Sequence, residues 1–167
     1  ILLVLDDFIL RSKVNNDLLN GLVLNMKDNK NINYLRLVPR PRPINKTQAV
    51  FDEISKKEPY RLSLQASLWR REILLSLLKE NESPWDFEIK GSNRSKTKDG
   101  FYSANLDLFP YKHHVIEKGK WFPWSYFILK SNKYPIDLDQ RQIMNLNESL
   151  IWTIKKMIGK IKSIFRK

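Results

Sequence analysis

Two neighbouring aspartates, Asp6 and Asp7, directly follow the apolar run of residues 1–5. A short, continuous apolar run of this kind predicts a buried strand whose carboxyl end opens into a site. Carboxylate oxygens at such a point are the ligands that a hard divalent cation prefers when it bridges a diphosphate. Because successive strand side chains point to opposite faces, we expect Asp7 to bind the metal directly and Asp6 to hold a ribose hydroxyl or a backbone group. The alternative is a pair of acids capped by loop amides.

A second group of candidate residues lies at the start of a predicted helix. Ser83 is suited to the N-cap and Pro84 to the first turn, and Trp85, Asp86 and Glu88 follow. An aromatic ring offers a face on which a sugar can lie, and a carboxylate within reach of a sugar hydroxyl can take its proton. Either Asp86 or Glu88 is therefore a candidate general base. The alternative is a capped helix whose aromatic residues belong to the core and whose acids complement the helix dipole.

Weaker candidates follow in residues 113–120. His113 and His114 lie on a stretch that alternates like a strand, so only one of them can readily join a site, and an imidazole is a suitable further ligand for Mn²⁺. We assign that role to His114. Lys118 and Lys120 flank a glycine, where the backbone can approach a diphosphate closely. The alternatives are a surface or core histidine and two solvated lysines.

The elements that must position these residues alternate between strands and helices. Strands are predicted at residues 1–5, 34–38, 60–64 and 108–117, and helices at residues 47–56, at residues 70–78 and from Ser83 onwards. Residues 39–43 form a stiff basic loop of Pro and Arg, residues 91–100 a flexible polar connection, and Gly119 a turn. This alternation predicts an α/β fold.

Composition narrows the class of protein. A chain of 167 residues with 42% hydrophobic residues can bury the core of one domain, and the absence of cysteine excludes disulfides and thiolate metal sites. No run reaches the roughly 18 consecutive apolar residues of a membrane span. The net charge of +12 is compatible with nucleic acid, an anionic membrane surface or phosphorylated substrates. Because the sequence begins inside an apolar run, we expect it to be a fragment.

The last 23 residues differ from the rest of the chain. Residues 145–167 contain six Lys or Arg and only Glu148 as an acid, so they carry +5 of the total charge of +12. Apolar residues recur there at three- and four-residue steps, which predicts a basic amphipathic helix. We expect this helix to lie on an anionic membrane surface. The alternatives are a terminal helix packed on its own domain or paired with another chain. We therefore divide the chain into a domain of residues 1–144 and a C-terminal helix of residues 145–167.

Three segments together resemble a known enzyme group. In their order and spacing, LDDF near the start, EPYRLSLQASLWRREILLSLLKENESPWDFE in the middle and KGKW further on resemble bacterial GT-A-like glycosyltransferases found with capsule and lipopolysaccharide genes. The resemblance covers roughly residues 1–124 and is strongest from 59 to 88. It implies a GT-A-like mixed sheet flanked by helices. It also implies that Asp6 and Asp7 match the DxD-like element of the family, although the pair departs from a strict Asp-x-Asp.

The resemblance also implies a reaction and a place for it in the cell. The enzyme would transfer a sugar from a UDP- or GDP-sugar to a hydroxyl of a glycan or lipid-linked acceptor, with Mn²⁺ or Mg²⁺ and with inversion. It would act in the cytoplasm or at the inner face of the cytoplasmic membrane. The part of the family that grips the nucleotide base would precede Ile1. The residues so implicated are Ser63, Gln65 and Trp69 in the sugar pocket, Trp85, Asp86 and Glu88 on the acceptor side, and Lys118 and Lys120 near the phosphates.

Two rival functions remain open at this point. The basic charge and the many aromatic residues would suit a nucleic-acid-binding module, but no recognisable binding motif is present and we expect no nucleic-acid partner. A non-catalytic domain at a membrane surface would explain the basic C-terminal segment. Binding of a nucleotide-sugar together with a metal would separate the enzyme from both rivals.

Overall fold

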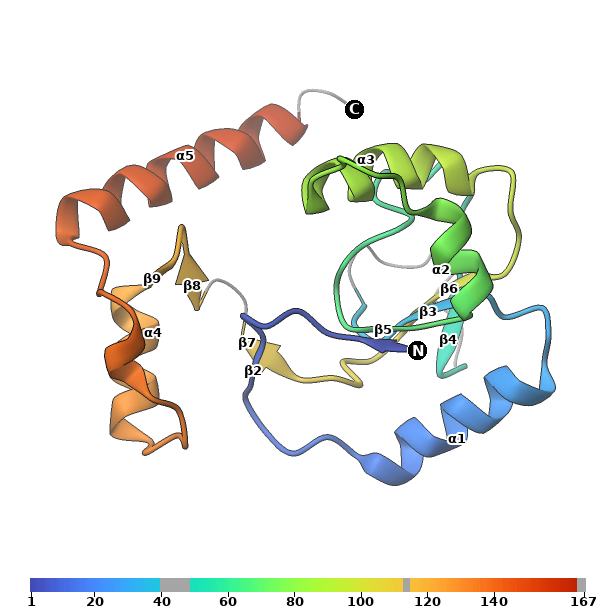
Figure 1. Cartoon of the computed structure of the whole chain (residues 1–167), viewed down its shortest axis with the longest axis horizontal. Coiled ribbons are helices and arrows are strands. Elements are labelled where there is room, and N and C mark those ends of the chain that lie inside the picture. The colour runs from blue at the N-terminus through green and yellow to red at the C-terminus, as the bar shows by residue number, and fades with distance from the viewer. Residues whose placement is uncertain (40–48, 113–114, 165–167) are drawn as a thin grey trace. The chain divides into compact units, whose positions relative to one another are not determined.

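The computed structural model describes residues 1–39, 49–112 and 115–164 (Figure 1). It is a mixed α/β structure with five α-helices in this described part, which confirms the expected fold class. The chain divides into two compact units, Ile1–Tyr111 and Lys112–Lys167. Among the described residues, no helix has the length and apolar character needed to cross a membrane.

The first unit is built on a five-stranded mixed sheet in the order β1-β5-β3-β6-β4. Strand β5 runs antiparallel to both β1 and β3, β6 runs parallel to β3, and β4 runs antiparallel to β6. Strands β1, β3 and β6 therefore point the same way. We call the side of the sheet at which these three strands have their carboxyl ends the carboxyl edge. The strand bounds are Leu2–Leu3 (β1), Tyr34–Arg36 (β3), Phe51–Glu53 (β4), Ser67–Trp69 (β5) and Phe101–Ala104 (β6). A separate two-stranded sheet joins β2 (Ile9–Leu10) to β7 (Tyr111–Lys112).

Helices cover both faces of the five-stranded sheet (Figure 1). Helix α1 (Asn16–Asp28) packs on the face where Leu35 and Leu68 point, and helices α2 (Arg71–Leu77) and α3 (Pro84–Ser95) pack on the face of Tyr34 and Trp69. This division follows from the strand geometry, because successive side chains alternate between the two faces. The core of the first unit is therefore two apolar clusters, one on each side of the sheet.

A row of polar side chains is buried on the α2 and α3 side. Arg36 is opposite Ser67 on β5 and Ser103 on β6, and all three side chains are buried. The Arg36 guanidinium donates hydrogen bonds to the backbone carbonyls of Tyr60, at 2.8 Å, and Arg61, at 3.0 Å. A charged group can remain in a protein interior only when such hydrogen bonds replace its contacts with water. Arg36 thus fixes the loop before β5 against the sheet.

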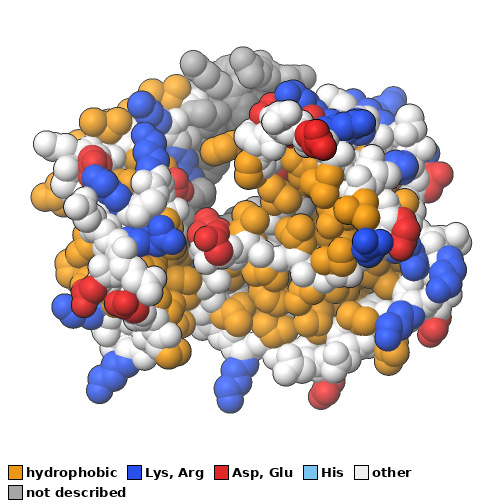
Figure 2. All heavy atoms as spheres, viewed as in Figure 1, with side chains coloured by type: hydrophobic (Ala, Val, Ile, Leu, Met, Phe, Trp, Pro, Cys, Tyr) orange, Lys and Arg blue, Asp and Glu red, His pale blue; other side chains and the backbone are white. Residues whose placement is uncertain are grey.

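Strand β1 lies at one end of the sheet order and keeps part of its surface exposed. Figure 2 shows hydrophobic side chains gathered between α3 and α1, in the region of β1. Ile1, Leu2 and Val4 belong to the exposed hydrophobic residues of the chain. The first unit therefore has an edge strand with an exposed apolar surface.

The second unit combines a hairpin with helices. Strands β8 (Ile116–Glu117) and β9 (Lys120–Trp121) are joined by Lys118 and Gly119, whose φ angles of 51° and 76° are those of a tight hairpin turn. Helix α4 (Pro123–Ser131), a short 3₁₀ helix (Leu138–Gln140) and helix α5 (Leu146–Ile164) follow. The ion pair between Lys120 and Glu148, at 2.6 Å, and the packing of Phe122 on Trp152 hold the first half of α5 to the hairpin.

Several predicted elements are confirmed. Strands occur within residues 1–5 and 34–38, a helix covers residues 71–77, and the turn at Gly119 is present. The first strand, however, is a short and largely exposed edge strand and not the buried strand that was expected. The helix predicted from Ser83 onwards begins as expected, because the Ser83 hydroxyl accepts a hydrogen bond from the backbone N–H of Asp86. These elements carry strong local signals in caps, glycines and hydrophobic periodicity.

Other predicted elements are wrong. The helix expected at residues 47–56 is replaced by β4, with residues 47 and 48 outside the described part. Residues 60–64, where a strand was expected, form a loop with turns, because the φ of 57° at Tyr60 is incompatible with a strand. The next strand, β5, begins at Ser67. Residues 91–100 were expected to form a flexible connection, but the first five of them are the last residues of α3. Gly91 packs close to Leu62 there. The single strand expected at residues 108–117 is two short strands, β7 and β8.

Candidate functional site

The acidic pair lies in a tight turn at the carboxyl edge. Strand β1 ends at Leu3, and the backbone N–H of Phe8 donates a hydrogen bond to the carbonyl of Leu5, at 3.2 Å, which closes the turn around Asp6 and Asp7. Strand alternation therefore does not govern the two carboxylates, contrary to the sequence argument. They nevertheless differ, because Asp6 is exposed whereas Oδ1 of Asp7 is buried.

Tyr111 connects this turn to the loop before β5. The ring of Phe8 stacks on that of Tyr111 with 3.9 Å between centroids, and the Tyr111 hydroxyl donates a hydrogen bond to Oε1 of Gln65. Burial raises the pKa of Tyr111 above its ordinary value, and the negative charges of Asp107 and Asp7 add to the rise. Tyr111 therefore remains a protonated hydrogen-bond donor at neutral pH.

The same loop is bonded to Glu88 on α3. The backbone N–H of Gln65 donates to Oγ of Ser63, at 3.2 Å, and the Ser63 hydroxyl donates to Oε1 of Glu88, at 3.1 Å. The backbone N–H of Leu64 donates to the same carboxylate oxygen, at 2.7 Å. A continuous set of hydrogen bonds thus joins Tyr111, Gln65, Ser63 and Glu88. We call these four residues the edge network.

Trp85 lies beside the edge network on the same helix. It precedes Glu88 by three residues, a spacing that brings two side chains to neighbouring positions on a helix surface. Its side chain is 73% exposed, so the ring is not part of the core, contrary to the alternative weighed for it from the sequence. An exposed indole next to a carboxylate is an arrangement that can hold a sugar ring.

Asp86 has a structural position in the helix cap. Its carboxylate accepts hydrogen bonds from the backbone N–H of Ser83, at 3.3 Å, and from the Ser83 hydroxyl, and pairs with Lys90 at 2.8 Å. The hydrogen bonds from Lys90 and Ser83 lower the pKa of Asp86 to about 2. A carboxylate of such low basicity is a weak proton acceptor at neutral pH, which makes Glu88 the better candidate of the two.

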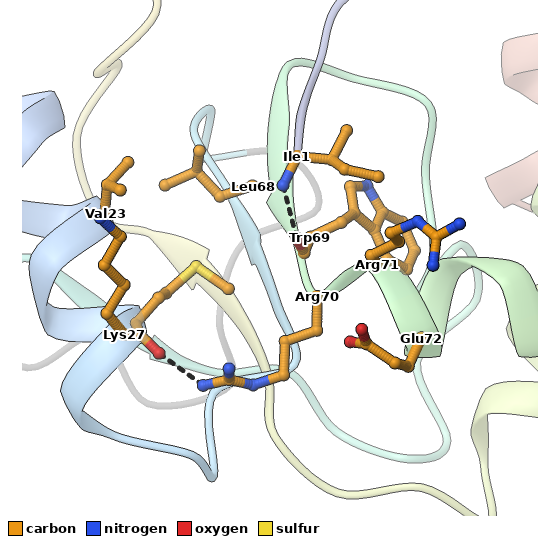
Figure 3. A pocket seen from close by; sticks show the side chains of 9 residues that line it. Ile1, Val23, Lys27, Leu68, Trp69, Arg70, Arg71 and Glu72 are labelled. Atoms are coloured by element: carbon orange, nitrogen blue, oxygen red, sulfur yellow. Dashed lines mark hydrogen bonds between the residues drawn. The ribbon is translucent and has the colours of Figure 1, made fainter.

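Trp69 lies away from the acidic turn, at the opposite end of β5. Its side chain is buried, its Nε1 donates to Oγ of Ser67 at 2.9 Å, and its ring packs on Tyr34. It borders a hollow of about 220 Å³, in which the Arg70 guanidinium reaches the carbonyls at the end of α1 (Figure 3). Trp69 therefore lies at the end of the sheet opposite to the carboxyl edge. It could contact a sugar only there, away from Asp6 and Asp7.

The remaining predicted residues belong to the second unit or lie outside the described part. Lys118 occupies the hairpin turn and Lys120 pairs with Glu148. His114, the predicted further metal ligand, lies outside the described residues. Within the described residues, no group of three or more His, Asp or Glu side chains converges as a complete metal site. Two adjacent carboxylates fit the mode in which Mg²⁺ is held by one or two carboxylates together with substrate phosphates.

Sequence reasoning missed two residues that organise this edge. Tyr111 is 46 residues from its partner Gln65, so no local spacing indicates the contact. Arg36 lies at an inward position of the strand predicted at residues 34–38. A basic residue at such a position indicates a buried side chain that is held by hydrogen bonds. Arg36 connects the loop before β5 to the five-stranded sheet, and Tyr111 connects it to β7.

Comparison with protein-family models, curated proteins and solved structures found no match to this chain. What the carboxyl edge can do follows from its chemistry. The exposed carboxylate of Asp6 and the half-buried one of Asp7 lie in one turn, and a third carboxylate, that of Glu88, lies beside an exposed indole across the edge network. This arrangement provides one acidic group for a cation and another for a proton.

Proposed function

We propose that this chain is the metal-binding and acceptor-binding part of a glycosyltransferase. It transfers a sugar from a UDP- or GDP-sugar to a hydroxyl acceptor in the synthesis of bacterial surface polysaccharide. The observation that carries the proposal is the edge network, which links the acidic turn of Asp6 and Asp7 to Glu88 on α3, the helix that also carries Trp85. Ligands of open α/β sheets bind outside the carboxyl ends of the strands, and both groups of residues lie there.

The acidic turn forms the donor side in this proposal. Asp7, with its partly buried carboxylate, and Asp6 hold Mn²⁺ or Mg²⁺, which when bound neutralises negative charge on the leaving diphosphate. Asp6 is the more exposed of the two and can also accept a hydrogen bond from a ribose hydroxyl. The stacking of Phe8 on Tyr111 fixes the turn, so both carboxylates keep their positions when a donor arrives.

Helix α3 forms the acceptor side. Trp85 offers its exposed ring to the face of a sugar, and Glu88 takes the proton of the attacking hydroxyl. Two hydrogen bonds fix Oε1 of Glu88, so the carboxylate keeps one orientation and its other oxygen can meet the acceptor. A single displacement with Glu88 as base inverts the configuration at the anomeric carbon.

The architecture supports the same proposal. A mixed sheet with helices on both faces agrees with the GT-A-like fold that the resemblance implies. Lys118 and Lys120 belong to the second unit, where Lys120 pairs with Glu148.

The proposal is tested by ligand-induced stabilisation. The longest natural chain that contains this sequence is melted with a panel of UDP- and GDP-sugars, with and without Mn²⁺. A ligand that binds only the folded state raises the melting temperature, and we expect one donor to do so in a metal-dependent way. The Asp7→Asn variant is the matched control and should lose the metal-dependent rise. A panel without any rise would contradict the proposal.

We propose in addition that α5 brings the enzyme to an anionic membrane surface at the cytoplasmic face, where a lipid-linked acceptor would be found. Six apolar residues of this helix are 46–83% exposed, namely Leu146, Leu150, Ile151, Ile154, Met157 and Ile158. Such an apolar surface together with lysines is typical of a helix lying in a lipid interface. A salt-sensitive shift of an oligonucleotide by the chain would instead favour the nucleic-acid-binding alternative.

A further inference from the structure

A second hollow of the first unit lies between the loop before β5 and α3. It has a volume of about 320 Å³, which is within the range of small-molecule sites. The loop contributes Lys57, Glu58 and Tyr60, and the helix contributes Asn93 and Lys96. None of these residues belongs to the edge network, so the hollow is a distinct feature of the fold.

Tyr60 is held in this hollow in a strained backbone conformation. Its φ of 57° lies in the left-handed region, which residues with a side chain adopt at a cost. The Arg36 guanidinium maintains this conformation by its hydrogen bond to the Tyr60 carbonyl, and the Tyr60 side chain is nevertheless 44% exposed. Strain of this kind is typical of ligand-binding positions. The fixed backbone of Tyr60 positions its partly exposed ring at the hollow, where a bound molecule can contact it.

The charges in the hollow are arranged for an anion. Lys56 and Lys90 each form an ion pair, with Asp99 and Asp86 respectively. Lys57 and Lys96, which line the hollow, form no ion pair with any other residue that the structure describes. With Glu58 as the acid of the lining, the two lysines give the hollow a net positive charge, which favours an oxyanion as ligand.

The chemistry of the lining selects a class of ligand. The Tyr60 ring and Ile89 offer apolar surface to the C–H face of a sugar, while Asn93 and Glu58 can exchange hydrogen bonds with hydroxyls. We propose that this hollow binds an anionic sugar unit of the acceptor, one that carries a phosphate or a carboxylate. The ammonium groups of Lys57 and Lys96 hold that anionic group.

The position of the hollow on α3 connects it to the proposed reaction, and this part of the inference rests on the proposed function. Asn93 follows Glu88 by five residues, so it lies roughly 7.5 Å further along the helix axis. Ser92, which also lines the hollow, is bonded to the backbone of Leu62 in the same loop that Glu88 holds. Ser92 also follows Glu88 by about one turn of the helix, so a sugar in the hollow would lie about one turn from Glu88, and the neighbouring sugar unit of the acceptor would carry the reacting hydroxyl.

Binding is measured by NMR titration of the isotope-labelled intact chain without metal or nucleotide. The probes are glucosyl phosphate, glucuronate, neutral glucose, inorganic phosphate and UMP. We expect glucosyl phosphate and glucuronate to shift the signals of Tyr60 and Asn93, and the other three probes to do so at least about tenfold more weakly. If one negative charge of either kind is sufficient for binding, both anionic sugars will bind. A preference for one of them will show whether the hollow recognises a phosphate or a carboxylate.

Two variants test the residues. The double variant Lys57→Gln/Lys96→Gln should weaken the binding of glucosyl phosphate by at least about tenfold, and the matched double variant Lys13→Gln/Lys30→Gln, on exposed residues elsewhere, should not alter it. The variants Tyr60→Gly and Tyr60→Ala should both weaken binding, and Tyr60→Gly should be the more stable of the two, because only glycine adopts a positive φ without strain. A Tyr60→Gly variant clearly less stable than Tyr60→Ala would contradict the strain argument.

Several outcomes would overturn the inference. Signals of the hollow that do not respond to either anionic sugar, or a response that survives the double lysine substitution, would exclude it as their site. Equal binding of inorganic phosphate or UMP would refute the assigned ligand class. These titrations contain no donor, so their failure is distinguishable from failure of the nucleotide-sugar panel, which reports on Asp6 and Asp7.

Discussion

The backbone N–H of Leu64 donates a hydrogen bond to Oε1 of Glu88, at 2.7 Å, so one carboxylate both holds the loop before β5 and faces the proposed acceptor side. The two roles can be separated by substitution. In Glu88→Gln the amide oxygen still accepts the bond from Leu64, but the side chain can no longer take a proton. We expect the turnover rate to fall by roughly 10²–10⁴-fold with donor binding and melting temperature nearly unchanged.

The variant Glu88→Ala is the matched comparison. It also leaves the Leu64 N–H and the Ser63 hydroxyl without their acceptor, so it should lower the free energy of unfolding by about 1–3 kcal/mol as well. The Asp86 carboxylate is already a weak base because its pKa is low, so Asp86→Asn should retain most of the turnover. If Glu88→Gln turns over as fast as the original chain, the base lies elsewhere.

The second prediction concerns the acidic turn. Asp7→Asn should abolish Mn²⁺-dependent donor hydrolysis or transfer, because an amide is a poorer ligand for a hard cation than a carboxylate. The melting temperature without metal should change little, since the turn is closed by backbone atoms of Leu5 and Phe8. Asp6→Asn should be less damaging if Asp6 contacts only the ribose. Full activity of Asp7→Asn, measured as sugar release or transfer, would show that the metal assignment is wrong.

The parts of the fold that sequence predicted correctly are those with local causes. Ser83, Pro84 and Asp86 specify the start of α3 through a cap and a fixed φ, and Gly119 specifies a turn. These signals act over a few residues, so they can be read without knowledge of the rest of the chain.

The parts that failed depend on distant partners. Leu62 and Leu64 alternate as in a strand, yet the loop is fixed by distant partners, and the strand forms from Ser67 onwards. The Arg36 guanidinium donates a hydrogen bond to the carbonyl of Arg61 in this loop, and the Arg61 guanidinium donates one to the carbonyl of Ser95 on α3. Strand β4 forms because Phe51 and Asp52 pair with residues of β6, not because of their own propensities. The edge network was not foreseeable for the same reason, since Tyr111 and Gln65 meet only once the sheet has formed.

The third prediction is a pH dependence of stability. The folded state holds the pKa of Asp86 at about 2, below its ordinary value near 4, through hydrogen bonds from Lys90 and Ser83. A depressed carboxyl pKa stabilises the fold above the unfolded value, and this stabilisation is lost as the pH falls from about 4 to about 2. Urea unfolding of Asp86→Asn across this window should show a shallower loss of stability than the original chain. Parallel curves for the two proteins would contradict the assigned pKa.

The fourth prediction tests the buried arginine. In Arg36→Met the carbonyls of Tyr60 and Arg61 lose their donor inside the protein, which should lower the free energy of unfolding by at least about 2 kcal/mol. The exposed Arg11, paired with Asp107, provides the control, and Arg11→Met should cost less than about 1 kcal/mol. Both are measured by urea unfolding at neutral pH. Equal effects of the two substitutions would mean that Arg36 does not fix the loop.

The last prediction concerns α5 and the proposed anionic membrane surface. Ile151 and Ile154 are exposed, so Ile151→Ser/Ile154→Ser should leave the unit folded while removing apolar area that would enter the lipid. Lys155 and Lys156 would each add about 1 kcal/mol of attraction to an anionic surface, so Lys155→Gln/Lys156→Gln should weaken binding to vesicles of phosphatidylserine and phosphatidylcholine. Co-sedimentation at low salt measures both effects, and vesicles of phosphatidylcholine without a charged lipid serve as the control. If the helix instead packs on protein, the serine variant will lower the melting temperature and the intact chain will not sediment with either vesicle, and the membrane role should then be abandoned.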